Sequence, residues 1–171
     1  MIGIDVIDLT DPLLQNRKNA MRFILHPEDC YPENAQSFWL LWAAKEAIFK
    51  AKRESLTFDP RRFPVEITPH KEKYGLQTDS FRGELFVTPN AILAVVNNKN
   101  SKKPVFEMLE AHDGASPMKV REALEQHLKK MKLIDTKVIT SADRMSVLSH
   151  NNLPVSFSHH GRYMAFAYPE F

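Results

Sequence analysis

The sequence predicts a single α+β domain in which an antiparallel sheet packs against one long helix. One observation is a series of short β-branched segments, several of them joined by turn residues, which is typical of strands and hairpins. The other is a stretch over residues 35–53 whose apolar residues recur at helical spacing. A chain of 171 residues can bury one sizeable core. Because the sequence shows neither a clear boundary nor an internal repeat, we expect residues 1–171 to form one domain.

The N-terminal third is expected to run strand, helix, loop, helix. Residues 2–9 are β-branched and typical of a buried strand. Pro12 after Asp11 suits a first helical turn, so a helix is predicted over 12–24. A loop with two prolines follows. The helix over 35–53 then has a core-facing side made of Phe38, Leu41, Ala44, Ile48 and Ala51.

The remainder is expected to consist mostly of strands. One helix is predicted from Pro117 to about Leu133, because Ser116 is a good N-cap and proline suits the first helical turn. Residues 105–109 fit a strand and a helix equally well. Strands are predicted at 65–68, 83–88, 91–97, 137–140, 145–149, 154–158 and 163–168.

The composition excludes several classes of protein. A single cysteine rules out an internal disulfide framework and multi-cysteine zinc or iron–sulfur sites. A net charge of +2 argues against a nucleic-acid binder that works by bulk charge. The sequence has no apolar run long enough to span a membrane, and its start lacks the basic segment of a signal peptide. We therefore expect a cytoplasmic protein in a reducing compartment, with no membrane partner.

Asp5 is the first candidate functional residue. Burying a carboxylate among Ile2, Ile4 and Val6 is costly unless it meets a partner, a metal ion or the strand end. Gly3 allows another chain segment or a ligand to approach closely. An aspartate that faces solvent at the edge of a sheet explains the same pattern equally well.

Glu46 and Lys50 form the second candidate pair. Residues four apart share one helix face, and a surface ion pair is the ordinary meaning of this spacing. Trp42 and Phe49 border the same face, however, and aromatic rings beside charges often line a site. A carboxylate with a lysine one turn away is suited to hold Mg²⁺ and to neutralise phosphate oxygens, because Mg²⁺ prefers one or two carboxylates together with substrate phosphate and water.

Ser156, Ser158, His159 and His160 cluster at a strand end beside Gly161. A serine hydrolase is not favoured, because the sequence has no Gly-x-Ser-x-Gly elbow and adjacent strand residues point to opposite faces. A histidine here either bonds turn backbone or donates to a phosphate, and the residues alone do not decide between them.

Basic residues gather in two places. Arg17 and Arg22 lie on the first predicted helix, where they form either a solvated face or a docking surface. The predicted helix from Pro117 carries lysines up to Lys132, but Glu122 and Glu125 dilute them and aromatic residues are not interleaved. We therefore expect no nucleic-acid partner.

Three segments together resemble the 4′-phosphopantetheinyl transferase superfamily. The first is Gly3-Ile4-Asp5 in the N-terminal strand. The second, Trp42-Ala43-Ala44-Lys45-Glu46-Ala47-Ile48-Phe49-Lys50, is similar to the family's W/F-x-x-K-E-x-x-x-K helix. The third is Val155-Ser156-Phe157-Ser158-His159 with the small-residue strand that follows it. Their order resembles the compact holo-acyl-carrier-protein synthase type, because the longer two-repeat type places its Ser-His motif before Gly-x-Asp.

The resemblance implies a phosphopantetheinyl transferase-like fold and the transfer of 4′-phosphopantetheine from coenzyme A to a serine of an acyl carrier protein, with release of 3′,5′-ADP. It implies that Asp5 and Glu46 hold Mg²⁺. Glu46 would take the proton of the carrier serine, directly or through a water on the metal. Lys50 and the metal would offset charge on the leaving phosphate.

The resemblance also implies the contacts to both substrates. Lys45, Lys50, Ser158 and His159 would contact coenzyme A. Arg17 and Arg22 match the region that meets the acidic carrier, where opposite charge speeds association. Asp8 would support the site from the opposite face of the strand.

The chain departs from the family pattern in two places. The compact type usually has a Gly-Thr-Gly run after its Lys-Glu helix, whereas residues 51–56 contain no glycine. A protein that binds coenzyme A or a carrier but has lost the transfer is therefore the alternative function. Residues 57–150 match no segment of the family and form an enlarged middle segment.

The resemblance also bears on assembly. The compact type commonly builds its site between subunits, so a homo-oligomer is expected, with a trimer favoured. The alternative is that the middle segment supplies the second wall of the site within one chain. The chain is too short for the two-repeat arrangement and longer than the compact type needs. The residues do not distinguish a fatty-acid carrier from the carrier of another pathway.

Overall fold

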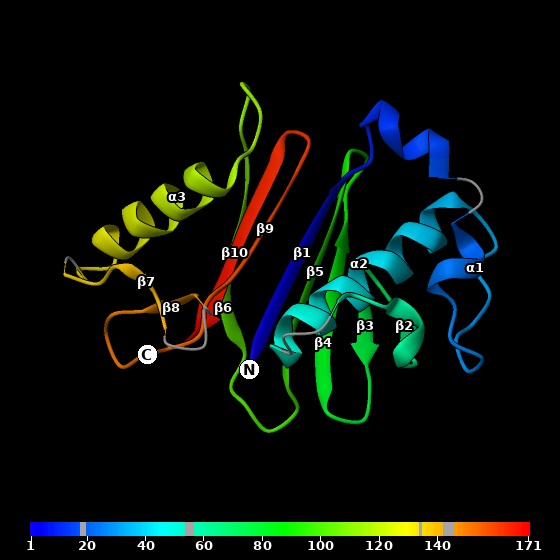
Figure 1. The fold of residues 1–171 in the computed structure, drawn as a ribbon, viewed down its shortest axis with the longest axis horizontal. Helices are drawn as coiled ribbons and strands as arrows, with labels where there is room; N and C mark the ends of the chain where they lie inside the picture. Colours follow the sequence, from blue (N-terminus) through cyan, green and yellow to red (C-terminus); the bar gives the residue numbers. More distant parts are fainter. Residues whose placement is uncertain (18–19, 54–56, 134, 142–145) are drawn as a thin grey trace.

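Two antiparallel sheets lie against each other, and a helix covers the outer face of each (Figure 1). The computed structural model describes residues 1–17, 20–53, 57–133, 135–141 and 146–171, without the side chains of 15–17 and 21–22. The larger sheet has the order β1-β5-β4-β3-β2, and the smaller has the order β6-β10-β9. A third, two-stranded sheet joins β7 and β8. The predicted α+β class with antiparallel sheets is confirmed.

The elements of the larger sheet and its helices come first in the chain. Their bounds are β1 Ile2–Asp8, η1 Pro12–Arg17, α1 Met21–Ile24, α2 Ala35–Lys52, η2 Pro60–Arg62, β2 Glu66–His70, β3 Lys73–Gln77, β4 Phe81–Val87 and β5 Ala91–Asn98. The elements of the smaller sheets follow. Their bounds are β6 Pro104–Glu110, α3 Pro117–Lys130, β7 Val138–Thr140, β8 Ser146–Leu148, β9 Ser156–His160 and β10 Tyr163–Pro169.

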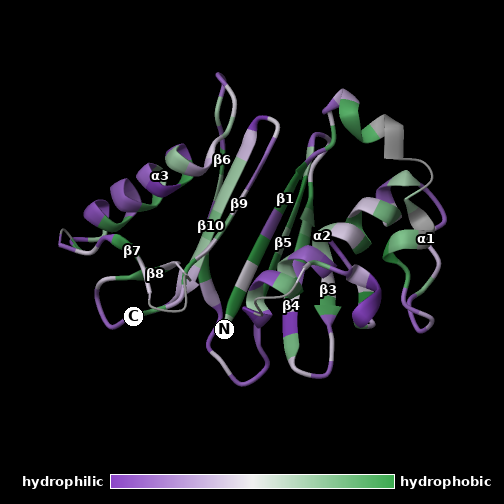
Figure 2. Cartoon of the chain, viewed as in Figure 1, coloured by the Kyte–Doolittle hydropathy of each residue, from purple (hydrophilic) through white to green (hydrophobic). Residues whose placement is uncertain are grey.

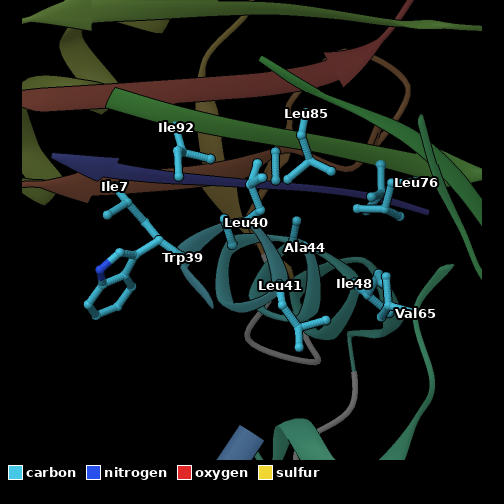
Figure 3. Packing of buried hydrophobic residues seen from close by; sticks show 14 of the residues in the cluster. Ile7, Trp39, Leu40, Leu41, Ala44, Ile48, Val65, Leu76, Leu85 and Ile92 are labelled. Atoms are coloured by element: carbon cyan, nitrogen blue, oxygen red, sulfur yellow. The ribbon is translucent and has the colours of Figure 1, made fainter. Parts of the chain in front are cut away.

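The long helix α2 covers the larger sheet, as predicted. Asn34 and Ser37 form a reciprocal capping box that fixes where it begins. Figure 3 shows Leu40, Ala44 and Ile48 of the helix facing the strands, with Ile92 and Leu85 on the sheet side. The predicted residues Phe38, Leu41, Ala44, Ile48 and Ala51 are all buried, but Leu40, Ala43 and Ala47 are buried as well, so the buried surface of the helix is wider than the predicted face.

Two further apolar layers complete the molecule. Ile4 and Val6 of β1 pack with Ala165 and Ala167 of β10 between the two sheets. On the other side of the smaller sheet, Leu124 and other apolar residues of α3 contact the strands, and the outer surface of α3 is largely hydrophilic (Figure 2). The layers run helix, sheet, sheet, helix. None of the described helices is long and apolar enough to cross a membrane.

The two halves of the chain repeat one topology, which the sequence did not reveal. In the first half β1 pairs with β5, and β5 pairs with β4. In the second half β6 pairs with β10, and β10 pairs with β9 in the same order. A helix follows the first strand in each half. The expectation of no internal repeat was wrong for the topology, and residues 57–150 hold the end of one unit and most of the next.

Several predicted elements differ in detail. The single helix expected over 12–24 is instead the 3₁₀ helix η1 and the short α1. Leu13 is 69% exposed while Leu14 is buried, so the apolar residues there do not form one continuous face. Strand β3 was not predicted, because Leu76 is its one buried residue and no alternation is visible. Residues 105–109 lie in β6.

Candidate functional site

A pocket of about 450 Å³ lies where α2 and β1 meet β9. Its polar lining comes from both ends of the sequence, and Leu14, Trp39, Trp42 and Phe157 contribute apolar and aromatic walls. The polar lining residues are Asp5, Glu46, Lys50, Ser158, His159 and His160. Residues from all three sequence motifs therefore line one cleft within a single chain.

Asp5 is buried in β1 and does not face solvent. Its Oδ1 accepts hydrogen bonds from Lys50 Nζ at 2.8 Å and from Ser158 Oγ at 2.8 Å. Burial, opposed by Lys50, raises the pKa of Asp5 to about 6. The carboxylate therefore has the partners that a buried charge requires.

Lys50 stands between two carboxylates. Its Nζ lies 2.8 Å from Asp5 Oδ1 and 3.5 Å from Glu46 Oε1. Although burial acts to lower the pKa of Lys50, Asp5 and Glu46 raise it above its usual range, so the ammonium stays charged. Trp42 donates its indole N–H to Glu46 Oε2 at 3.0 Å, which fixes the direction of that side chain.

Gly3 sets how closely α2 approaches β1. A Cβ at this position would lie 1.9 Å from the carbonyl oxygen of Ala47 and 2.7 Å from the amide nitrogen of Ala51. A side chain there would push the helix away from the strand, and with it Glu46 and Lys50. The glycine thus brings the helix carboxylate and lysine to Asp5.

The free edge of β1 is bonded by side chains of β9. The N–H groups of Ile4 and Val6 donate to the hydroxyls of Ser156 and Ser158 at 3.0 and 3.1 Å. Since Ser158 also donates to Asp5, its hydroxyl holds the carboxylate rather than pointing freely at a ligand. Serines at alternate positions thus replace a backbone ladder where the two halves meet.

His159 is exposed and lines the same pocket. Burial, with help from nearby Lys50, lowers the pKa of His159. A largely neutral imidazole at the rim of the pocket offers a hydrogen-bond donor to a phosphate, as the resemblance implies.

Lys45 is not brought to the pocket. Its Nζ is wholly buried, forms an ion pair with Asp29 at 2.5 Å, and donates to the carbonyls of Pro60 and Phe63 at 2.8 and 3.1 Å. These partners use all three hydrogens of the ammonium. A phosphate in the pocket is out of its reach in this arrangement, so we leave Lys45 out of the proposed site.

The two predicted carrier-binding residues belong to short elements near the pocket. Arg17 ends η1 and Arg22 lies in α1, but their side chains fall outside the described part of the structure. Asp8 is buried at the end of β1, away from Asp5, and accepts from Thr10 and Arg162. It supports the site without lining the pocket.

Asp5 and Glu46, the two carboxylates of the pocket lining, suit a divalent cation. Asp5 and Glu46 both lie against one cation, the Lys50 ammonium, so their oxygens already converge on a single positive charge. Within the described ranges, no cluster of three or more His, Cys, Asp or Glu side chains forms a metal site. Two carboxylates with substrate oxygens are a donor set that Mg²⁺ accepts.

Arg53 is the C-cap of α2. It adopts a left-handed conformation (φ 54°), the conformation in which glycine is usual at a helix end. Its guanidinium donates to the carbonyl of Ser146 at 2.6 Å and to that of Val155 at 3.5 Å. The arginine therefore links the end of α2 to the second half of the chain.

Sequence reasoning grouped Ser156 and His160 with Ser158 and His159 but assigned neither of them a role in the site. The available signal was their period of two with Ser158, which places all three side chains on one face of a strand. What the sequence does not contain is the partner, since the bonded backbone lies 152 residues away.

The chain was compared with known proteins. A family model described as the 4′-phosphopantetheinyl transferase superfamily matches residues 1–95, which is more than half of the chain. The match contains β1, α2 and most of β5, and therefore Asp5, Glu46 and Lys50. No curated protein and no solved structure matches the chain significantly.

Proposed function

Because the chain belongs to the 4′-phosphopantetheinyl transferase superfamily, we propose that it transfers 4′-phosphopantetheine from coenzyme A to a serine of an acyl carrier protein, as a holo-acyl-carrier-protein synthase. The observation that carries the proposal is the convergence of Asp5, Glu46, Lys50 and His159 on one pocket. The cytoplasm remains the compartment we predict, because a single, unpaired cysteine is typical of reducing compartments.

The residues of the pocket divide the chemistry between them. Asp5 and Glu46 would hold Mg²⁺, which supplies charge neutralisation at the pyrophosphate of coenzyme A when it is bound. Glu46 accepts the proton of the carrier serine, whose oxygen attacks the phosphorus next to pantetheine. The bond from that phosphorus to 3′,5′-ADP breaks. Lys50 offsets the charge that develops on the leaving group.

The surrounding residues bind and orient. Ser158 keeps Asp5 in place, and His159 donates to the nucleotide end of coenzyme A. Arg17 and Arg22 attract an acidic carrier to the η1–α1 side. Since both walls of the pocket come from one chain, the proposed reaction does not require the trimer that the compact type suggests, and residues 1–171 work as one unit.

The proposal is tested by a transfer assay with coenzyme A, Mg²⁺ and an apo carrier. Asp5→Asn, Glu46→Gln and Lys50→Met should each lower turnover about a hundredfold or more, because each removes a group that acts on the transition state. Glu122→Gln, an exposed carboxylate on α3, is the matched control and should leave turnover unchanged.

Calorimetry separates the transferase from a protein that only binds. A transferase should bind coenzyme A more weakly when Mg²⁺ is withheld or Glu46 is replaced by alanine. Tight binding that needs no metal and survives Glu46→Ala, with no transfer to any carrier, would favour the alternative function.

A further inference from the structure

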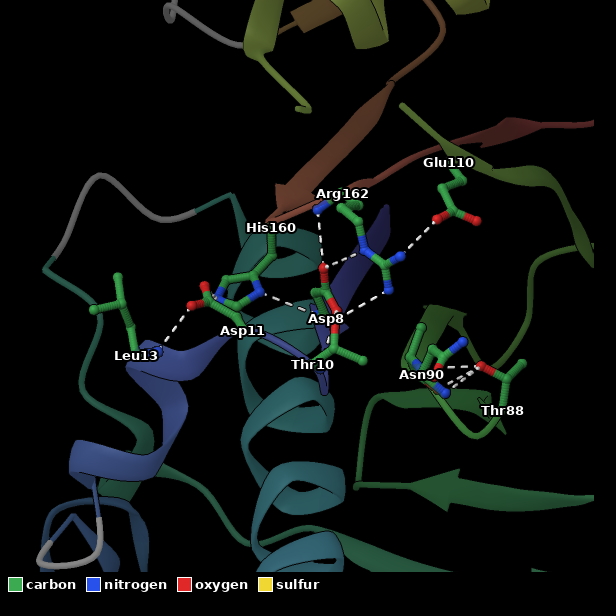
Figure 4. Close-up of polar contacts among 10 residues, drawn as sticks. Asp8, Thr10, Asp11, Leu13, Thr88, Asn90, Glu110, His160 and Arg162 are labelled. Atoms are coloured by element: carbon green, nitrogen blue, oxygen red, sulfur yellow. Dashed lines mark hydrogen bonds and ion pairs between the residues drawn. The ribbon is translucent and has the colours of Figure 1, made fainter. Parts of the chain in front are cut away.

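The turn between β9 and β10 is bonded to the end of β1 and to the segment that follows it (Figure 4). His160 Nδ1 accepts the backbone N–H of Asp8 at 3.1 Å. The backbone N–H of Arg162 donates to Asp8 Oδ2 at 3.0 Å, and its Nε lies 3.4 Å from the same oxygen. Asp8 is thus held by both flanks of a turn in the second half: His160 bonds its backbone, and Arg162 bonds its buried carboxylate.

The contacts of this turn continue beyond Asp8 to Thr10. Arg162 Nη2 donates to Thr10 Oγ1 at 3.0 Å, and Thr10 in turn donates to Asp8 Oδ1 at 2.6 Å. The other guanidinium nitrogen of Arg162 lies 3.0 Å from Glu110 Oε1, which orients it from behind. These bonds lower the pKa of Asp8 even though its burial acts to raise it, so the carboxylate remains charged.

His160 carries the contact to the start of η1. Since Nδ1 accepts from Asp8, the neutral ring bears its hydrogen on Nε2. That nitrogen lies 3.6 Å from Asp11 Oδ2, and Asp11 Oδ1 accepts the N–H of Leu13 in the first turn of η1. One imidazole therefore connects β1 to the first turn of η1.

Gly161 allows the turn to close on Asp8. Its φ is +55°, and a Cβ there would lie 2.5 Å from Asp8 Oδ2. A side chain at this position would be strained and would also displace the carboxylate. Asp8, Thr10, His160, Gly161 and Arg162 therefore act together, and we call them the turn clamp.

We propose that the turn clamp positions η1 as the wall of the pocket that receives the carrier, and that Arg162 and His160 are positioning residues for carrier recognition. This inference rests on the proposed function. Leu14 of η1 lines the pocket, and the clamp holds the residues just before it. Among the described residues, neither Asp5 nor Glu46 nor Lys50 bonds the clamp, and Arg162 does not line the pocket. Binding of coenzyme A should therefore depend little on Arg162.

Two variants separate the positioning role from general stability. His160→Asn keeps an acceptor for the Asp8 N–H but loses the contact to Asp11. Arg162→Gln loses the bonds to Thr10 and Glu110. In each, KM for the apo carrier should rise about tenfold or more. The comparison with coenzyme A is made with Arg162→Gln, whose KM for coenzyme A should change less than about twofold, because Arg162 does not line the pocket whereas His160 does. Arg162→Lys should recover part of the loss, because it keeps the charge without the planar fork.

Arg82→Gln is the matched control, since Arg82 is an exposed arginine of β4 whose guanidinium bonds the carbonyl of Ser101 on the other side of the molecule. It should leave both KM values unchanged. Hydrogen exchange gives a readout that does not need catalysis: amides of residues 9–14 should exchange faster in Arg162→Gln than in the wild type and in Arg82→Gln.

The outcomes are distinguishable. If the wild type modifies a carrier but both KM values rise together, or neither rises, the inference is wrong and the proposed function stands. Unchanged exchange over residues 9–14 would also overturn the inference. If the wild type modifies no carrier, the proposed function fails, and the carrier role of the clamp fails with it.

Discussion

At the scale of single residues, Asp5 combines burial with two side-chain hydrogen bonds in the pocket, from Lys50 and Ser158. Its charge is retained because Lys50 and Ser158 bond it, but burial still outweighs them and its pKa is raised from 3.8 to about 6. A carboxylate that is costly to ionise in the folded chain is one that gains from a bound cation. Burial of Asp5 therefore costs stability at neutral pH, and metal binding by this residue is part of the proposed function.

The first prediction concerns the pH dependence of stability without metal. Between about pH 4 and 6, folded Asp5 keeps a proton that the unfolded chain has lost, so the wild type loses stability as pH rises through this range. The shift corresponds to about 3 kcal/mol. Asp5→Asn lacks this titration. The variant should therefore gain about 3 kcal/mol relative to the wild type between about pH 4 and 7.

Urea denaturation at several pH values, with chelator present, measures this difference. A free-energy difference between the two proteins that does not change with pH, or that moves in favour of the wild type, would show that burial does not dominate at Asp5.

Residues also show the limits of sequence reasoning. Glu46 and Lys50 could be predicted as a pair because helical spacing fixes their neighbourhood. Lys45 lies in the same motif, yet its ammonium is buried with Asp29, which belongs to a preceding loop. Helical spacing alone does not show that the side chain of a lysine will turn towards a partner in a loop.

At the scale of elements, the contact of α2 with β1 decides the site. Strand and helix were both predictable from β-branched residues and apolar periodicity. The sequence only suggested that another segment approaches Gly3 closely. It did not show that this segment is α2, whose Ala47 carbonyl lies against the glycine. The seam between β1 and β9 was not predictable, since side chains replace its backbone bonds.

The second prediction tests this close approach. Gly3→Ala should destabilise the fold by about 2 kcal/mol or more, because the new Cβ meets helix backbone that cannot rotate away. It should also lower transfer activity by moving Glu46 and Lys50 from Asp5. Gly75→Ala in β3 is the control, since its Cβ would meet side-chain atoms of His70 and Thr68 at 3.0 Å that are free to shift.

Chemical denaturation and a transfer assay of both variants check this. Equal stability losses for Gly3→Ala and Gly75→Ala, with activity intact in both, would mean that the spacing between helix and strand is not set at Gly3.

At the scale of the whole molecule, the two repeated units are not equivalent. The corresponding strands β1 and β6 end at Asp8 and Glu110. The residues three positions before these ends are Asp5 and Glu107. Glu107 contacts His127 of α3 at 2.9 Å, in place of a lysine. Between β4 and β6 the rings of Phe86 and Phe106 lie 5.5 Å apart, whereas serines join β1 to β9. Aromatic rings therefore meet at the β4–β6 seam, where the corresponding β1–β9 seam has serine hydroxyls bonded to backbone.

The repeat could not be recognised from the sequence, because the two halves share the order in which their strands pair and not a pattern of residues. What sequence alone could give was the three motifs at the two ends of the chain. That these ends meet within one chain depends on β6 to β10 repeating the arrangement of the first half, and no residue pattern in 57–150 announces it.

The third prediction follows from the single-chain site. Glu46→Ala and His159→Ala should each reduce transfer, and a mixture of the two refolded together should stay as inactive as either alone. Recovery of activity in the mixture would place Glu46 and His159 of the working site on different chains, as in an intersubunit site.

The most direct test of the account is the mass of an apo carrier after incubation with the wild type, coenzyme A and Mg²⁺, across carriers from several pathways. The account predicts that at least one carrier gains the mass of one phosphopantetheine at its serine, and that Glu46→Gln abolishes the gain while Glu122→Gln preserves it. Carriers that all keep their apo mass would contradict the account.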